Sequence, residues 1–264
     1  MAHKTLVVGT AYDTLGGKCL VGGTGYGIKK GRTLVGGTGY DINFSAYDPV
    51  FANNTWAEII AACQEKKVPD TWAVGNTKAM TIGGSDYAIA IIGKNHDDYA
   101  DGSGKAPLTL QMVEVYTGTY RMHSNDKNTS GWNACYMRNT VLPTVLSNMP
   151  SEVQSGIRSV NKLTLAEGMV STIETAADGL FLLSAIEILS KVSYSATGEG
   201  SRYAYYANGG SGFLNLASSR YHWTRSPNKD NTTSYISIRN DNGSARDASQ
   251  KATTANSIAP AFCF

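Results

Sequence analysis

The sequence lacks long apolar runs, and it lacks any block of like charge. No stretch approaches the roughly 18 apolar residues that a membrane-spanning helix needs, and the residues after Lys4 do not form the apolar core of a signal peptide. The 23 lysines and arginines nearly balance the 21 aspartates and glutamates, so the basic patch that marks nucleic-acid binding is missing. We therefore expect neither membrane insertion nor nucleic-acid binding, and a chain that is made in the cytoplasm and reaches its place by assembly.

Cysteine is scarce, which limits the role of disulfides and thiolate metal sites. The four cysteines are Cys19, Cys63, Cys135 and Cys263, and they lie far apart in the sequence. There is no Cys-x-x-Cys pair and no spacing typical of a zinc site. We expect reduced cysteines that lie mostly in the core.

The best candidate for a metal site is the segment His96-Asp97-Asp98. A calcium loop of the EF type, counted from Asp97, would need a ligand at the third position and a glutamate at the twelfth. Those positions hold Tyr99 and Leu108, so the pattern fails. We expect these aspartates to cap backbone amides of a loop, and we predict no bound metal.

No set of side chains has the spacing of a catalytic site. His123, His222, Glu114 and Glu187 are scattered along the chain. The segment 210–212 (GSG) is not a nucleophile elbow, which needs G-x-S-x-G between a strand and a helix. The paired carboxylates of a glycoside hydrolase cannot be identified either. We expect no enzymatic activity and no cofactor.

Three copies of a glycine-rich repeat occupy residues 6–19, 20–33 and 34–47. Each begins with Leu-Val, passes Gly-Thr and has a tyrosine at its seventh position. Neither a Walker loop nor a Rossmann fingerprint fits the spacing of these glycines. We expect short β-strands with hairpin turns at Gly16-Gly17 and Lys30-Gly31. Such hairpins bury little surface alone, so residues 1–47 are predicted to serve attachment or oligomerisation.

After residue 47 the pattern becomes mixed α+β. Thr55 and Glu58 form a capping box that predicts a helix to about Lys66. The remaining predicted elements are strands at 78–82, 87–93, 108–116, 161–165, 179–184, 221–226, 234–239 and 257–264, a helix at 134–146 interrupted at Pro143, a helical turn from 151 and an apolar segment at 185–189. Residues 193–215 are rich in Gly, Ser and Tyr, and they predict a long surface insertion.

Residues 218–257 combine many polar side chains with a few apolar ones. About half of this stretch is Asn, Ser, Thr or Asp, and together with tyrosine these types resemble the composition of an antibody paratope. Alternation along 234–239 predicts that Ile236 and Ile238 point inward, so that the residues between them point outward. The predicted ligand-binding surface comprises Tyr221, His222, Asn228, Asn231, Ser234, Tyr235, Ser237, Arg239, Asn240, Asn242, Ser244, Arg246 and Asp247.

Five motifs carry a resemblance to a known family: 91–98 (IIGKNHDD), 133–138 (NACYMR), 179–184 (GLFLLS) with Glu187, 223–227 (WTRSP) and 258–262 (IAPAF). Through them, residues from about 56 to 264 resemble a domain of unknown function that is widespread in gut bacteria and their prophages. The resemblance extends to the variable proteins of diversity-generating retroelements, in which a reverse transcriptase rewrites adenine positions in a C-terminal gene segment. The glycine-rich repeats resemble those at the start of phage structural proteins.

The resemblance implies an α+β fold, with a C-type-lectin-like ligand-binding domain at 48–264 and a variable region at about 218–257. It implies a phage tail adhesin of the virion, made in the bacterial cytoplasm, that forms a homo-oligomer, with a trimer favoured. The implied partners are a host cell-surface protein or glycan, and other tail proteins through residues 1–47. The alternatives are a structural tail or cell-surface protein without a specific ligand and, third, a glycan hydrolase.

Overall fold

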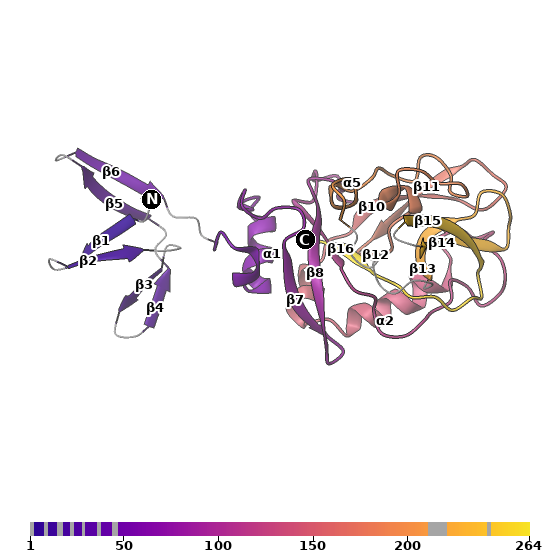
Figure 1. Ribbon diagram of the computed structural model, residues 1–264, viewed down its shortest axis with the longest axis horizontal. Coiled ribbons are helices and arrows are strands. Elements are labelled where there is room, and N and C mark those ends of the chain that lie inside the picture. Colours follow the sequence, from indigo (N-terminus) through magenta and orange to yellow (C-terminus); the bar gives the residue numbers. More distant parts are fainter. Residues whose placement is uncertain are drawn as a thin grey trace. The chain divides into compact units, whose positions relative to one another are not determined.

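The computed structural model divides the chain into two compact units, Met1–Trp72 and Ala73–Phe264 (Figure 1). It describes the backbone of all residues except 1–2, 8–9, 15–17, 22–23, 28–29, 36–37, 44–46, 211–220 and 242–243. Side chains are described for residues 47–210, 221–239 and 245–264. Each unit is considered by itself.

Each glycine-rich repeat forms one antiparallel hairpin. The three hairpins pair β1 (His3–Val7) with β2 (Thr10–Thr14), β3 (Lys18–Val21) with β4 (Thr24–Gly27), and β5 (Lys30–Val35) with β6 (Thr38–Asn43). The innermost pairs are Val7 with Thr10, Val21 with Thr24 and Val35 with Thr38. The hairpins therefore share one register, and the predicted β-hairpin repeat is confirmed.

The predicted position of the turns is wrong where it can be compared. Lys30 and Gly31 lie inside β5, paired with Asn43 and Ile42, whereas Gly16 and Gly17 lie outside the described residues. Glycine favours turns because it tolerates backbone angles that other residues avoid. In a repeat with several glycines, that tolerance alone does not decide which pair reverses the chain.

The rest of the first unit is a short helical segment. A 3-10 turn (Phe51–Asn53) precedes α1 (Trp56–Gln64). The predicted capping box is confirmed, because the Thr55 hydroxyl accepts the Glu58 N–H and the Glu58 carboxylate accepts the Thr55 N–H. The Trp72 ring packs edge-on against Phe51, with ring centres 5.4 Å apart. This packing joins the two ends of the helical segment, which belongs to the first unit, while the domain boundary after residue 47 stays a prediction.

The second unit is built on a five-stranded antiparallel sheet. Its strand order is β12 (Leu180–Phe181), β16 (Ala261–Cys263), β9 (Leu108–Met112), β8 (Ser85–Lys94) and β7 (Thr77–Ile82). The strands predicted at 78–82 and 87–93 are confirmed as β7 and β8, which form a hairpin with Gly83 and Gly84 at φ of 58° and 83°. The strand β16, close to the C-terminus, lies between β12 and β9, which buries the residues of the predicted closing strand.

Helices and a second sheet follow along the chain. A π-helical segment (Met137–Val141) continues into α2 (Leu142–Ser147), and α3 (Ser151–Gly156) follows. Pro143 does not interrupt the predicted helix, because it lies in the first turn of α2, where its missing N–H is tolerated. The two-stranded sheet pairs β10 (Val160–Leu165) with β11 (Ile173–Asp178), and β11 was not predicted.

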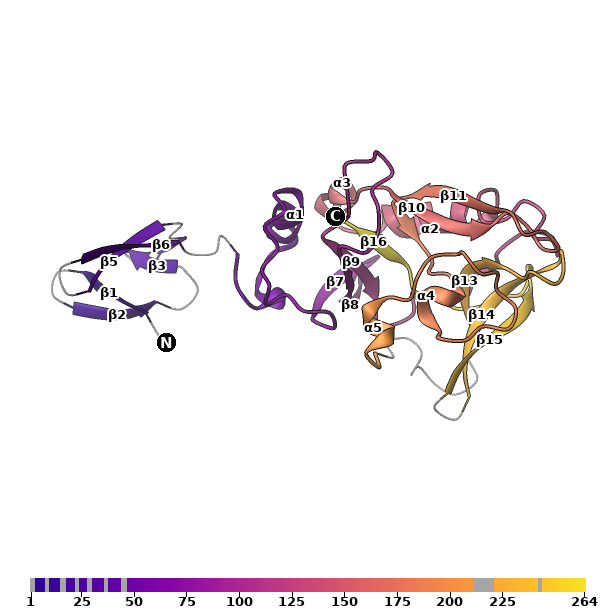
Figure 2. The ribbon, with the colours of Figure 1, turned by 90° about the horizontal axis from the view of Figure 1, so that it is seen from above.

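A third sheet contains most of the predicted variable region. It is antiparallel, in the order β13 (Tyr221–Pro227), β14 (Ser234–Asp241) and β15 (Ser244–Lys251). Within the second unit, it lies on the side away from β7 and β8 (Figure 2). The predicted strands at 221–226 and 234–239 are therefore confirmed, and β15 pairs antiparallel with the second of them.

The described part of the predicted surface insertion at 193–215 is largely exposed, but several of its side chains are buried inside the unit. Short helices α4 (Ala185–Ile188) and α5 (Ala204–Ala207) flank a segment in which Glu199 and Tyr203 are completely buried. The Tyr206 hydroxyl donates to the Gln111 side chain at 2.6 Å. Glycine and serine made this segment look loop-like, but its tyrosines bring large apolar rings and hydroxyl groups that find partners inside the unit.

The core of the second unit contains aromatic and aliphatic side chains from several of the predicted strands. Phe181, Ile236, Ile238 and Phe262 have exposed fractions of 0%, and Trp223 has 3%. The inward orientation predicted for Ile236 and Ile238 is confirmed, and Phe181, Trp223 and Phe262 lie in segments that were predicted as strands. Helices together with several antiparallel sheets give the mixed α+β class that the sequence predicted.

Candidate functional site

The three-stranded sheet places three large polar side chains in one row. In the registers of β13, β14 and β15, Tyr221 is opposite Arg239, and Arg239 is opposite Arg246. Directly opposite residues share one face of a sheet and lie close enough to interact. Tyr221 and Arg239 are half-buried, and Arg246 is exposed. We call Tyr221, Arg239 and Arg246 the surface row.

A cavity of about 430 Å³ opens at the surface row. Its described lining residues are Ser193, Tyr194, Tyr221, Arg239, Arg246, Asp247, Ala248, Ser249 and Gln250. The Arg239 guanidinium donates to the Tyr221 hydroxyl at 2.7 Å, and its central carbon lies 5.5 Å from the centre of the Tyr221 ring. This contact orients one cationic group at the cavity, and the second cation, Arg246, is exposed.

Asp247 fixes one wall of this cavity through hydrogen bonds to the backbone. Its exposed fraction is 8%. Its Oδ2 atom accepts hydrogen bonds from the backbone N–H groups of Ser193 and Tyr194, at 2.6 and 2.8 Å. The segment that contains Ser193 and Tyr194 is therefore attached to β15. Tyr194 has an exposed fraction of 39%. The prediction of Asp247 as an exposed residue is wrong, because its carboxylate binds the backbone of residues 193 and 194.

Tyr235 and Ser237 also differ from the prediction, which had both pointing outward. Both have exposed fractions of 0%. The Tyr235 hydroxyl donates to the Gly131 carbonyl at 2.7 Å, and the Ser237 hydroxyl donates to the Ala248 carbonyl. Alternation indicates an inner and an outer face only where one face meets solvent. Here β14 is the central strand, and residues 234–238 are covered on both faces.

His222, Asn228 and Ser234 are buried as well, with exposed fractions of 1%, 2% and 6%. The Asn228 amide donates to the Ser249 hydroxyl at 2.7 Å. The buried Asn128 amide donates to the Ser234 carbonyl at 2.6 Å and to the Asn231 carbonyl at 2.9 Å. These bonds fix the connection between β13 and β14, so its asparagines are structural, and the prediction of an exposed His222, Asn228 and Ser234 is wrong.

Asn231 is half-buried, and its side-chain carbonyl accepts the Thr233 N–H at 3.0 Å. Asn240, Asn242 and Ser244 lie outside the residues whose side chains are described. Of the predicted surface, the structure thus brings together Tyr221, Arg239 and Arg246 around one cavity, and it assigns several others to the framework. Sequence reasoning missed Tyr194, which reaches the cavity from a loop distant in the chain.

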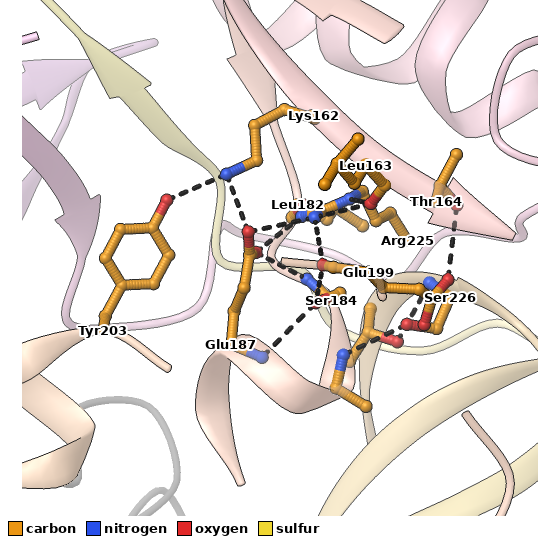
Figure 3. A network of polar contacts seen from close by, with 12 residues as sticks. Lys162, Leu163, Thr164, Leu182, Ser184, Glu187, Glu199, Tyr203, Arg225 and Ser226 are labelled. Carbon is orange, nitrogen blue, oxygen red and sulfur yellow. Dashed lines mark hydrogen bonds and ion pairs between the residues drawn. The ribbon is translucent and has the colours of Figure 1, made fainter. Parts of the chain in front are cut away.

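A buried ionic network surrounds Arg225 of the three-stranded sheet (Figure 3). Arg225 of β13 has an exposed fraction of 0%. Its Nη1 and Nη2 atoms bind the two carboxylate oxygens of Glu187 at 2.6 and 3.0 Å. The same guanidinium donates to the backbone carbonyls of Leu163, Leu182 and Glu199. A guanidinium is suited to this role because it offers five donors in a fixed plane.

Lys162 extends the network to the five-stranded sheet. Its ammonium lies 2.8 Å from Glu187 Oε1 and 2.6 Å from Asp97 Oδ1, and it donates to the Tyr203 hydroxyl at 2.9 Å. Burial alone would raise the pKa of Asp97 and of Glu187, but the neighbouring cations and hydrogen bonds hold both below their ordinary values. The charges of two cations and two carboxylates therefore balance in the interior.

The network contains residues to which the sequence analysis gave a different role or none. Asp97 belonged to the rejected calcium loop, and the expectation that it caps loop amides is wrong, because its carboxylate binds Lys162, Thr109 and Tyr203. A sequence signal did exist. Glu187 lies inside the short apolar segment 185–189, and ionised residues that are buried are usually paired.

The pKa of Glu199, beside this network, is shifted in the opposite direction. Burial raises its pKa above the ordinary value near 4.5, against the opposing hydrogen bond from the Leu165 N–H. The folded protein therefore holds the Glu199 proton to higher pH than the unfolded chain does. The stability that this proton contributes is present below the unfolded pKa and is lost as pH rises through the folded pKa.

Replacing Glu199 with glutamine removes this titration. The free energy of unfolding of Glu199→Gln, relative to the unmodified chain, should therefore increase as pH rises from about 4.5 upward. Urea denaturation of both chains over a series of pH values measures this difference. A difference that does not change with pH would show that Glu199 does not titrate with a raised pKa.

The three cysteines whose side chains are described lie in the interior. Cys63, Cys135 and Cys263 are buried and free, as predicted, while Cys19 lies outside the residues with described side chains. Burial raises the pKa of the Cys63 and Cys135 thiols to about 12, so they stay protonated at neutral pH. Among described residues, no three His, Cys, Asp or Glu side chains are grouped to hold a metal ion.

Comparison with known proteins identifies one family. The sequence profile described as "Domain of unknown function (DUF6273)" matches residues 103–264, which is more than half of the chain. No curated protein and no solved structure matches the chain. Within the described residues, none of the helices has the length and apolar character to span a bilayer.

Proposed function

This chain belongs to the family of the domain of unknown function DUF6273, and we propose that it is a phage tail adhesin. In this proposal, a C-type-lectin-like scaffold presents a diversified ligand-binding surface to the host cell. The antiparallel β13–β14–β15 sheet with its side cavity supports such a use. The fold alone does not specify a ligand, so the argument depends on the site.

The observation that carries the proposal is the division of the predicted variable region into two groups of residues. Tyr221, Arg239 and Arg246 line a cavity. Arg225 and Tyr235, from the same strands, are completely buried and hydrogen-bonded to the interior. A surface of this kind can change its side chains while the residues that hold the strands remain constant. Diversification of a binding protein requires such a separation.

The N-terminal hairpins fit an attachment role in the same proposal. Three hairpins with one shared register repeat the same backbone edges along residues 3–43. Strand edges carry unpaired N–H and C=O groups that favour pairing with other chains. We propose that these edges join the adhesin to other tail proteins and to further copies of itself, as a trimer, in the virion.

The test is a triple variant, Tyr221→Ala, Arg239→Ala and Arg246→Ala. Tyrosine and arginine are frequent binding hot spots, each contributing about 2 kcal/mol or more, so adhesion to host cells should fall at least about tenfold. Thermal unfolding should change little, because none of the three lies in the buried network. Binding of the labelled full chain to cells of candidate host bacteria measures the first effect, and a melting curve measures the second.

The matched control replaces Arg121 and Lys127, two exposed cations outside the cavity lining, with alanine. This control removes the same number of positive charges and should leave adhesion unchanged. Equal adhesion of the triple variant and the unmodified chain would support the alternative, a structural tail or cell-surface protein without a specific ligand. A glycan hydrolase would instead shorten host polysaccharide, which the same incubation reveals.

A further inference from the structure

Lys162, Asp97 and Glu187 bring an amine and two carboxyl groups into direct contact. The Lys162 Nζ atom lies 2.6 Å from Asp97 Oδ1 and 2.8 Å from Glu187 Oε1. The side chains of Lys162 and Glu187 point toward each other in the interior (Figure 3). An amine can attack the carbon of a neighbouring carboxyl group, and a second carboxylate can move the protons that the attack requires. The three side chains therefore have the composition of a site that forms an amide cross-link.

The burial of this group changes the balance between an ion pair and an amide. The side chains of Lys162, Asp97 and Glu187 have exposed fractions of 2%, 3% and 2%. Aromatic rings cover the amine, since Nζ lies 4.6 Å from the ring centre of Phe181 and 5.3 Å from that of Tyr203. In water, the hydration of an ammonium and a carboxylate opposes their condensation. Burial has already removed this hydration, and the fixed geometry replaces a chance encounter, so the interior favours the amide more than water does.

The charge balance of the network permits the same reaction. Arg225 binds both carboxylate oxygens of Glu187. Condensation of Lys162 with Asp97 would remove one positive and one negative charge together. The pair of Arg225 and Glu187 would remain, so that no buried charge is left without a partner.

Hydrogen-bond donors surround the Asp97 carboxylate. The Thr109 hydroxyl donates to Oδ2 at 2.5 Å, and the Tyr203 hydroxyl lies 2.8 Å from Oδ2 and 3.0 Å from Oδ1. Attack by an amine on the carboxyl carbon places negative charge on a carboxyl oxygen. Donors already in place at Oδ2 stabilise that charge. Oδ1, the oxygen beside Lys162, is then the one that leaves.

We propose that Lys162 and Asp97 join their side chains in an amide bond, with Glu187 as the acid–base residue. Glu187 Oε1 takes a proton from the Lys162 ammonium, which frees the electron pair of Nζ. A bond forms between Nζ and the Asp97 carboxyl carbon, and the bond from that carbon to Oδ1 breaks. Glu187 transfers the two protons that Nζ loses, one after the other, to the leaving oxygen, which departs as water. The reaction needs no oxidant, reductant or further reactant.

The cross-link would connect two distant parts of the second unit. Asp97 follows β8, Lys162 lies in β10, and 65 positions separate them in the chain. A bond that closes such a loop stabilises a protein mainly by restricting its unfolded chain. None of the three residues belongs to the described lining of the cavity at the surface row, so the proposal is independent of what that cavity binds.

The mass of the denatured full chain tests the proposal. The unmodified chain should be lighter than its sequence by the mass of one water molecule. Lys162→Arg is the matched control, because a guanidinium keeps the positive charge and the donors but stays protonated and cannot attack a carboxyl carbon. This variant should have the full mass of its own sequence, and so should Asp97→Ala.

Glu187→Gln tests the acid–base role separately. Glutamine has nearly the shape of glutamate but cannot take a proton from Lys162. The loss of water, followed by mass in samples taken at intervals after synthesis, should therefore slow by about a hundredfold or more. Loss of water at an unchanged rate would refute the role of Glu187.

Proteolytic digestion of the unmodified chain locates the bond. The peptide that contains Asp97 should be joined to the peptide that contains Lys162, and fragmentation should place the link on these two side chains. Loss of water within one peptide, for example by cyclisation of Asp101 onto Gly102, would give the same intact mass without a link and would overturn the proposal. An unmodified chain with the full mass of its sequence would overturn it as well, whether or not the variants fold.

Discussion

Replacing Arg225 with alanine is expected to lower the free energy of unfolding by about 3–5 kcal/mol, the usual cost of breaking a buried ion pair. The variant leaves the Glu187 carboxylate with Lys162 as its only remaining partner in the ionic network. It also removes the donors that bind the carbonyls of Leu163 and Leu182. Buried acceptors without donors add to the cost.

Arg225→Lys separates the effect of charge from that of geometry. A lysine keeps the positive charge but cannot supply the planar set of donors that reaches both Glu187 oxygens and several carbonyls. It should therefore recover only part of the loss. Arg121→Ala, at an exposed arginine whose guanidinium lies 5.1 Å from the Tyr136 ring centre, should cost about 1 kcal/mol or less. Urea denaturation measures all three, and equal losses for Arg225→Ala and Arg121→Ala would refute the structural role of the network.

Replacing Phe181 with alanine is expected to cost about 3–5 kcal/mol, the range for a fully buried aromatic residue. Phe181 is completely buried in β12, where it pairs with Ala261 of β16. The Lys162 ammonium lies 4.6 Å from the centre of its ring, so the aromatic face also stabilises the buried cation. Truncation would leave a cavity and would remove this contact at the same time.

Phe181→Leu provides the comparison for Phe181→Ala. Leucine refills much of the cavity but offers no aromatic face to Lys162, so its loss should be intermediate. Chemical denaturation of the two variants at neutral pH gives the two losses of free energy. A loss below about 1 kcal/mol for Phe181→Ala would contradict the placement of this ring in the core.

Local and apolar features of the fold could be predicted from the sequence. The capping box at Thr55 and Glu58 depends on residues that are neighbours in the chain, and the hairpin at Gly83-Gly84 depends on two adjacent glycines. Burial of Phe181 and Ile236 follows from their apolar side chains. These features need no knowledge of which distant segments meet.

The framework around the site could not be predicted in this way. Lys162 and Arg225 meet through Glu187, which lies between them in the sequence but far from both, and no local pattern encodes such a meeting. Tyr235 shows a second reason why the sequence did not predict this framework. Alternation along β14 assigned it to the solvent side, but β14 is covered on both faces, and the Tyr235 hydroxyl binds the Gly131 carbonyl.

The residues of the candidate site could be predicted from the sequence only in part. The polar composition of residues 218–257 directed attention to the correct sheet, and Tyr221, Arg239 and Arg246 do line one cavity. Composition could not separate these three from Asp247 or Asn228, because the same residue types serve as contacts on the surface and as anchors inside. Only the positions of the partners Ser193 and Ser249 decide that question.

The central claim is that a variable binding surface is carried on a constant framework, and sequencing of the gene tests it most directly. Many phage particles or lysogens of one lineage would be sequenced across the codons for residues 218–257. The account predicts that substitutions concentrate at the codons of Tyr221, Arg239 and Arg246, while those of Arg225 and Tyr235 remain constant. Substitutions spread evenly over exposed and buried positions, or a region that does not vary at all, would contradict it.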